Sequence, residues 1–227
     1  EIAQCLVGSE MCIRDRYKRT GKINIVSAGR TEGITLNIGF DNSEAYSAWK
    51  AKKLNSITLP SISGGTVSGL MSSINWFFTD SHEDFAIFQI VVKNDSKDGT
   101  YYPQYINRIT LDSNGEYALC YQARTETLLI NDTPTETSLP EGYGVAPFLY
   151  VHRVLDFIFS EFGYTITENP FKTDKELSSL VILNNAADCC VTGILNYADL
   201  MPDCTIEDFL NALYVRFGLV YNVSSDT

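Results

Sequence analysis

The sequence predicts an α+β protein with a β-rich N-terminal part, containing hairpins and one helix, and a smaller C-terminal part with two amphipathic helices. Three observations predict this class: apolar residues alternate with polar ones before residue 140, turn-forming residues separate the alternating segments, and two helical apolar stripes follow. With 227 residues, 44% of them hydrophobic, the chain can bury a sizeable core. We place domains over residues 17–140 and 141–227; the alternative is that both parts share one core.

The first sixteen residues do not enter this prediction. Leu6–Arg16 reads LVGSEMCIRDR, which matches in frame the translation of a transposase-type sequencing-library adapter. We therefore expect Glu1–Arg16 to be an artefact of the sequence read and the native chain to continue upstream of Tyr17. The alternative is a genuine N-terminal segment. We also expect that the C-terminal domain can continue beyond Thr227.

Alternating apolar residues predict short strands before residue 140. Lys22–Ala28 and Gly33–Phe40 flank a Gly-Arg-Thr-Glu-Gly turn, which predicts a β-hairpin with one buried face. One helix is predicted over about Glu44–Leu54, because the preceding Asp-Asn-Ser supplies residues that cap helices. Further strands are predicted at Ile57–Leu59, Ile74–Phe78, Phe85–Lys93, Ile106–Leu111, Tyr117–Gln122 and Thr127–Ile130.

Turn-forming residues separate these strands. Pro60–Leu70 is rich in Ser and Gly but lacks a phosphate-binding motif, which favours a flexible surface connection. Asn114-Gly115 is the dipeptide typical of hairpin turns. Asn131–Pro147 is rich in Thr, Pro and Gly, and we predict that it links the two domains.

One pattern occurs twice in the C-terminal part. Apolar residues at offsets 0, 3, 4, 7 and 11 form one stripe of a helix, and a glycine then favours a left-handed helix end. Strands are predicted to follow at Tyr164–Ile166 and Leu219–Val223. The predicted structural core of this part is Val151, Val154, Leu155, Ile158, Phe162, Gly163, Ile206, Phe209, Leu210, Leu213, Phe217 and Gly218. The pattern indicates either a duplicated scaffold unit or two unrelated amphipathic helices.

Local signals predict where these helices begin. Pro147 is expected in the first turn of the first helix, because proline is tolerated there. Thr173 or Asp174 is expected to cap a short helix. Thr205 and Asp208 form a pair that resembles a capping box at the start of the second copy, with Asp in place of the usual Glu.

The sequence contains no motif for catalysis, a cofactor or a metal ion. A net charge of −11 without any basic run argues against nucleic-acid binding. No apolar stretch approaches the roughly 20 residues that span a bilayer, and the N-terminus does not resemble a signal peptide. His82, in Asp-Ser-His-Glu-Asp, could ligate a metal, but a solvated turn is the favoured interpretation; His152 is expected on a helix surface. We predict a non-enzymatic protein with no catalytic, cofactor-binding or metal-binding residues.

Cysteine spacing also indicates no metal site. Outside the first sixteen residues the cysteines are Cys120, Cys189, Cys190 and Cys204. No CxxC or Cys/His ligand spacing occurs, and adjacent cysteines rarely pair with each other. We expect free, buried thiols in a reducing cytoplasm.

Two other functions are compatible with the sequence. Aromatic residues could stack on sugars in a carbohydrate- or cell-surface-binding module, although core packing explains most of them equally well. These residues are Trp49, Trp76, Tyr101, Tyr102, Tyr105, Tyr117 and Tyr121. A glycan hydrolase needs only two carboxylates, for which Asp80, Glu83 and Asp84 are candidates.

Two stretches resemble a known family. The first is Gly21–Leu59, with GKINI, EGITLNIGFDNSEAYSAWKAKKL and SITLP; the second is Pro147–Val223, with PFL, FGY, NPF, MPDCT, DFL and FGL. Both resemble regions of tail proteins from phages and prophages of Bacteroidetes. The resemblance implies a non-enzymatic baseplate or tail-hub component of the virion that is assembled in the cytoplasm of the bacterial host. It implies other tail and baseplate proteins as partners and a homo-oligomeric ring, a trimer or hexamer, without nucleic acid or membrane insertion.

Overall fold

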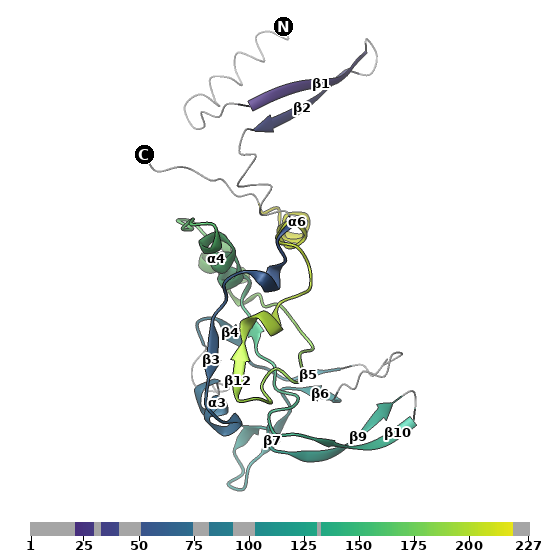
Figure 1. Cartoon of the computed structure of the whole chain (residues 1–227), viewed down its shortest axis with the longest axis vertical. Helices are drawn as coiled ribbons and strands as arrows, with labels where there is room; N and C mark the ends of the chain where they lie inside the picture. Colours follow the sequence, from purple (N-terminus) through teal and green to yellow (C-terminus); the bar gives the residue numbers. More distant parts are fainter. Residues whose placement is uncertain are drawn as a thin grey trace. The chain divides into compact units, whose positions relative to one another are not determined.

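A computed structural model describes residues 21–29, 33–40, 51–74, 82–92, 103–130 and 133–219. The chain folds as two compact units, Glu1–Lys50 and Ala51–Thr227. Figure 1 shows short strands together with helices, so the protein has mixed α+β character. The predicted adapter segment and residues 44–50 of the predicted helix lie outside the described residues.

The first unit contains an antiparallel hairpin. Strands β1 (Gly21–Gly29) and β2 (Gly33–Phe40) pair from Gly21 opposite Phe40 to Gly29 opposite Gly33, with an irregularity between Ile25 and Ser27. This pairing confirms the hairpin that the alternating pattern predicted. An irregular position of this kind locally increases the twist of a strand pair.

The described part of the second unit is built from short antiparallel pairs and helices. The pairs are β3 (Ser61–Ser63) with β12 (Ile194–Asn196), β4 (Phe85–Ala86) with β11 (Phe148–Leu149), β5 (Ile90–Val91) with β6 (Tyr105–Ile106), β7 (Ile109–Leu111) with β8 (Tyr117–Leu119), and β9 (Arg124–Ile130) with β10 (Thr133–Leu139). The helices are α3 (Val67–Ile74), α4 (Val151–Glu161), α5 (Pro170–Thr173) and α6 (Ile206–Phe217), with 3₁₀ turns η1 (Leu54–Ser56), η2 (Leu177–Ser179) and η3 (Tyr197–Leu200).

Segments on both sides of residue 140 share one core. Strand β3 pairs with β12, and β4 pairs with β11, although each pair is far apart in the sequence. The largest fully buried side chains come from the whole unit: Tyr197, Phe85, Phe148, Phe171, Leu54, Leu70, Ile74, Ile106, Leu128, Leu149, Ile158 and Leu195. Each buried aliphatic or Phe side chain contributes about 1.5–3 kcal/mol relative to an exposed one. The division between the two units falls after Lys50 and not near residue 140.

The segment predicted as a linker contains a strand and buried residues, so it does not connect two separate domains. Residues 133–139 form β10, which pairs with β9 from Thr133 opposite Ile130 to Leu139 opposite Arg124. Val145 and Ala146 are fully buried. Threonine favours strands, and proline is tolerated in a strand that has a free edge, so the Thr- and Pro-rich composition is compatible with a hairpin arm.

Other boundaries differ from the prediction for local reasons. Residues 60–70 contain β3 and the start of α3, and residues 57–59 form no strand. Asn107, with φ of 54°, separates β6 from β7 within the predicted strand over residues 106–111. Pro147 lies before β11 and not in the first turn of α4, where it was predicted. The helix begins only at Val151, because the backbone of Tyr150 is extended.

The turn that contains Asn114 and Gly115 connects β7 to β8, and these two strands form the predicted hairpin. Leu111 pairs with Tyr117, and the Gly115 N–H donates to the Asp112 carbonyl oxygen over 3.1 Å. Of the Asn-Gly pair only Gly115 has a positive φ, 81°. The connection therefore differs from a two-residue type I′ turn, which requires a positive φ at both residues.

Both copies of the helical pattern form helices that end at the predicted glycines. Gly163 and Gly218 have φ values of 77° and 68°. At the end of α4, the Gly163 N–H donates to the Ser160 carbonyl and the Tyr164 N–H to the Phe159 carbonyl, which is a Schellman motif. The predicted strand over residues 164–166 does not form, and residues 220–223 lie outside the described chain.

The two copies differ at their last apolar residue. The first four stripe residues of each copy are buried: Val151, Val154, Leu155 and Ile158 in α4, and Ile206, Phe209, Leu210 and Leu213 in α6. Phe162 is half-buried and caps α4, whereas Phe217 is the last residue of α6, is 40% exposed and packs edge-on against Phe171. The two phenylalanines do not occupy equivalent core positions, which argues against a duplicated unit.

Candidate functional site

Asp84 connects three segments of the second unit through its carboxylate. Arg153 of α4 donates from Nε to Oδ1 over 2.5 Å, and the Tyr197 hydroxyl of η3 donates to Oδ2 over 2.9 Å. Asp84 is only 7% exposed. A buried carboxylate is tolerated only when paired and hydrogen-bonded, and both of its oxygens are engaged here.

Arg153 extends this network on α4. Its Nη1 lies 3.3 Å from Asp156, its guanidinium carbon lies 5.5 Å from the centre of the Phe157 ring, and Nη2 lies 3.8 Å from the exposed Glu83. Burial, followed by the hydrogen bond to Asp84, raises the pKa of Tyr197, so this hydroxyl remains a donor at neutral pH. The network holds α4 and η3 against β4.

His82 packs beside this network. Its ring stacks on Phe85 with centroids 4.0 Å apart, and Nδ1 accepts the Asp84 backbone N–H over 3.1 Å. Burial lowers the pKa of His82, which favours the neutral ring that this contact needs. Asp80 lies outside the described residues, and within the described ranges no group of three or more His, Cys, Asp or Glu side chains could hold a metal ion.

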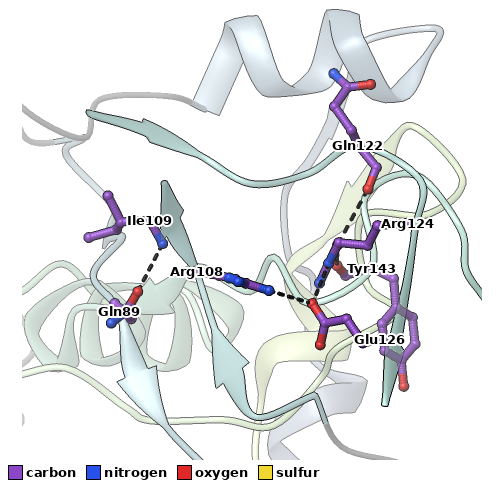
Figure 2. Close-up of polar contacts among 7 residues, drawn as sticks. All are labelled: Gln89, Arg108, Ile109, Gln122, Arg124, Glu126 and Tyr143. Carbon is purple, nitrogen blue, oxygen red and sulfur yellow. Dashed lines mark hydrogen bonds and ion pairs between the residues drawn. The ribbon is translucent and has the colours of Figure 1, made fainter. Parts of the chain in front are cut away.

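A second polar network centres on Glu126 of β9 (Figure 2). Its Oε1 accepts from Arg124 Nε over 2.5 Å and from Arg108 Nη1 over 3.1 Å. Arg124 also donates from Nη1 to the carbonyl oxygens of Gln122 and Tyr143, over 3.4 and 3.1 Å. The Arg124 and Glu126 side chains are 14% and 13% exposed, so water screens this ion pair only weakly.

Neighbouring hydrogen bonds hold the segments around this network in place. Gln89 accepts the Ile109 backbone N–H over 2.9 Å, at the start of β7 (Figure 2). Close by in the sequence, the buried Asn107 side chain donates to the carbonyls of Phe88 and Ala146 and accepts the Ala146 N–H. These bonds fix the left-handed backbone of Asn107 and join the segment before β7 to the segment before α4.

Glu161 ties the end of α4 to the first residues of the second unit. Its carboxylate pairs with Lys52 and accepts the Thr58 backbone N–H over 2.8 Å. The hydrogen bonds from Lys52 and Thr58 lower the pKa of Glu161 from 4.5 to about 2. The helical pattern places Arg153, Asp156 and Glu161 away from the apolar stripe, on the side expected to face solvent; they are instead half-buried and paired.

The aromatic and carboxylate candidates are partly described. Tyr117 is 67% exposed on β8, whereas Tyr105 and Tyr121 are half-buried. Trp49, Trp76, Tyr101 and Tyr102 lie outside the described residues. Of the proposed hydrolase carboxylates, Glu83 is exposed and Asp84 is engaged by Arg153 and Tyr197.

The sequence does not predict the networks around Asp84 and Glu161, because their partners are distant in the chain, nor the contact of Glu126 with Arg108. Asp84 and Arg153 are 69 residues apart, and Glu161 and Lys52 are 109 residues apart. Local signals exist for Arg153 with Asp156, which have the i, i+3 spacing of a helical ion pair, and for Arg124 with Glu126, which are two residues apart on β9. In the described residues, these side chains connect segments of the fold to one another.

A comparison with protein-family models, with curated proteins and with solved structures finds no match to this chain. Within the residues that the structure describes, every helix is too short or too polar to cross a bilayer.

Proposed function

We propose that this chain is a non-enzymatic structural component of a phage tail, at the baseplate or tail hub, that acts through protein–protein assembly. The observation that carries the proposal is the resemblance of two stretches to tail proteins of Bacteroidetes phages and prophages. Its partners are other tail and baseplate proteins and further copies of this chain, arranged as a trimeric or hexameric ring in the virion. No catalytic residue, cofactor or metal ion takes part.

The motifs behind the resemblance have structural roles in the second unit. Asn169 caps α5 by accepting the Phe171 backbone N–H over 3.0 Å, and Phe171 is buried. Thr205 and Asp208 form a complete capping box at the start of α6. Residues that hold a scaffold in shape suit a protein whose task is to present surfaces to partners.

Exposed apolar side chains support the assembly part of the proposal. Tyr214, Val215 and Phe217 on α6 are 58%, 81% and 40% exposed. On β7 and β8, the cross-strand neighbours Leu111 and Tyr117 are 62% and 67% exposed. Covering such groups removes apolar area from water, at about 25 cal/mol per Å².

Self-association tests the assembly part directly. Native mass spectrometry of the purified chain should show a trimer or hexamer, and Tyr214→Lys with Val215→Lys should shift the population towards monomer. The matched control is Leu183→Lys, which changes an equally exposed side chain outside α6. A monomer at every concentration tested, or an unchanged oligomer in the double variant, would contradict assembly through α6.

A glycan array separates assembly from carbohydrate recognition. A hub component should bind no glycan above background, whereas a surface-binding module should give reproducible signals. Tyr117→Ala is the useful variant, because Tyr117 is the exposed aromatic residue of the described candidates. Glycan binding that this variant abolishes would favour the carbohydrate-binding alternative.

A further inference from the structure

Two adjacent thiols lie side by side in the core of the second unit. The Sγ atoms of Cys189 and Cys190 are 3.8 Å apart, and the residues are 7% and 0% exposed. Cys189 also donates its S–H to the Val145 carbonyl oxygen over 3.2 Å. The pair lies in the turn before β12, beside Gly142, where any side chain would meet the Cys190 carbonyl.

We propose that Cys189 and Cys190 form a bidentate binding site for a soft, thiophilic metal or metalloid ion. Soft ions select thiolate ligands. A centre about 2.3 Å from each sulfur, the length of a Zn–S bond, would subtend an S–centre–S angle of about 111° at the observed separation of 3.8 Å. This angle is close to tetrahedral, so the two sulfurs need little movement to bind one centre.

The separation of the two sulfurs is that of unbonded thiols. A disulfide requires the sulfurs to approach to about 2.05 Å, far less than the 3.8 Å observed. A closed zinc site requires four protein ligands, and in the described ranges no third His, Cys, Asp or Glu side chain joins the pair. The ligand class that fits is therefore an ion satisfied by two protein thiolates, with its remaining positions filled by its own substituents.

Access and protonation set the conditions for binding. The turn around the pair contains exposed Asp188 and Thr192, and irregular segments of this kind open locally more readily than helices or strands. Hydrogen bonding to Cys190 and burial raise the pKa of the Cys189 thiol, so this thiol is protonated at neutral pH.

Phenylarsine oxide tests the site because its arsenic takes two thiols. The As–O bonds break, two As–S bonds form, and the two thiol protons leave with the oxide oxygen as water, without oxidation or reduction. Native mass spectrometry of the intact chain should show one arsenical that a dithiol removes and an equal concentration of monothiol does not. Peptide mapping should place it on Cys189 and Cys190.

Substitutions make the result decisive. Cys189→Ser and Cys190→Ser should each abolish the dithiol-reversible adduct, whereas a chain with Cys5, Cys12, Cys120 and Cys204 all changed to Ser should keep it. Circular dichroism checks that each variant is folded, and the map on the unaltered chain does not depend on variants. The proposal is overturned if the native chain forms no adduct, or if the adduct maps to other cysteines or persists in either single variant.

Discussion

Asp84 lies directly before β4 and connects it to α4 and η3. These contacts determine how much stability the protein loses when the carboxylate is removed. Both carboxylate oxygens are engaged, by Arg153 and by Tyr197. Without the carboxylate, a guanidinium and a hydroxyl would remain in a largely buried site without their partner. Desolvation of such groups costs more than the loss of the contact itself.

We predict that Asp84→Ala lowers the free energy of unfolding by about 3–5 kcal/mol, the range for breaking one side of a buried ion pair. Urea denaturation followed by circular dichroism measures the change. The control is Glu83→Ala, one residue away, whose side chain is 78% exposed and lies 3.8 Å from Arg153. This control should cost less than about 1 kcal/mol. Equal effects from both substitutions would show that the Asp84 network is not the stabilising element.

Glu161 makes a pH-dependent contribution with a defined sign. Its pKa is about 2 in the folded protein, against the ordinary glutamate value of 4.5. A group whose pKa is depressed by folding stabilises the protein fully above the unfolded pKa. That stabilisation is lost as the pH falls from about 4.5 towards 2, because protonation weakens the contacts with Lys52 and Thr58.

The corresponding variant is Glu161→Gln, which keeps the size of the side chain and removes its charge. We predict that it is less stable than the unaltered chain at pH 7 and that the difference narrows as the pH approaches 2. Chemical denaturation of both proteins over this pH range measures the difference between their free energies of unfolding. The contributions of the other carboxylates cancel in this difference. A difference that stays constant with pH would rule out Glu161 as the titrating group.

At the level of single elements, local signals predicted the helix caps and the two hairpins β1–β2 and β7–β8, but not the pairing of distant strands. The capping box of Thr205 with Asp208 and the glycines at 163 and 218 depend on neighbours within a few residues, so the sequence carries them directly. Strands β4 and β11 have two residues each and pair across more than 60 positions. Such a short segment has no periodicity of its own, and the packing of the whole unit selects its partner.

The polar networks likewise contain some contacts that are local in the sequence and others that depend on the fold. The i, i+3 spacing of Arg153 and Asp156 is visible in the sequence, whereas the pairing of Arg153 with Asp84 depends on the fold. Arg124 and Glu126 are two residues apart on β9, so their side chains share one face of the strand. Arg108 joins them only because the chain brings its segment next to β9.

The capping box at the start of α6 should make a measurable contribution to stability. The Thr205 hydroxyl accepts the Asp208 backbone N–H over 3.1 Å, and the Thr205 N–H donates to the Asp208 carboxylate over 3.2 Å. Thr205→Ala should lower the free energy of unfolding by about 0.5–2 kcal/mol, and Thr205→Ser should retain most of the stability. Thermal denaturation compares the three proteins. If Ser and Ala are equally destabilising, the hydroxyl is not the group that matters.

At the scale of the whole molecule, the main revision concerns domain organisation. The change from β-rich to helical composition suggested a boundary near residue 140, but β3 and β4 pair with strands that follow it. The Asp84 network crosses the same position, from the residue directly before β4 to α4 and η3. Composition reports which elements a segment forms and carries no information on whether two segments share a core.

A fragment experiment tests the shared core. We predict that residues 141–227 expressed alone show no cooperative unfolding transition, because β11 and β12 lose their partners and Arg153 loses Asp84. Residues 51–227 should unfold cooperatively, since they contain all of these contacts. Denaturant titration of both fragments measures this. A cooperative transition in the shorter fragment would show that it is a domain in its own right.

The proposed role as a structural component of a phage tail requires that this chain be present in phage particles, which can be measured. Phage particles induced from a host that carries the gene should be purified on a density gradient and analysed by quantitative mass spectrometry. We predict peptides from the second unit in the particle fraction, at a copy number that is a multiple of three per tail. If the particles contain the other tail proteins and lack these peptides, the chain is not a component of the tail.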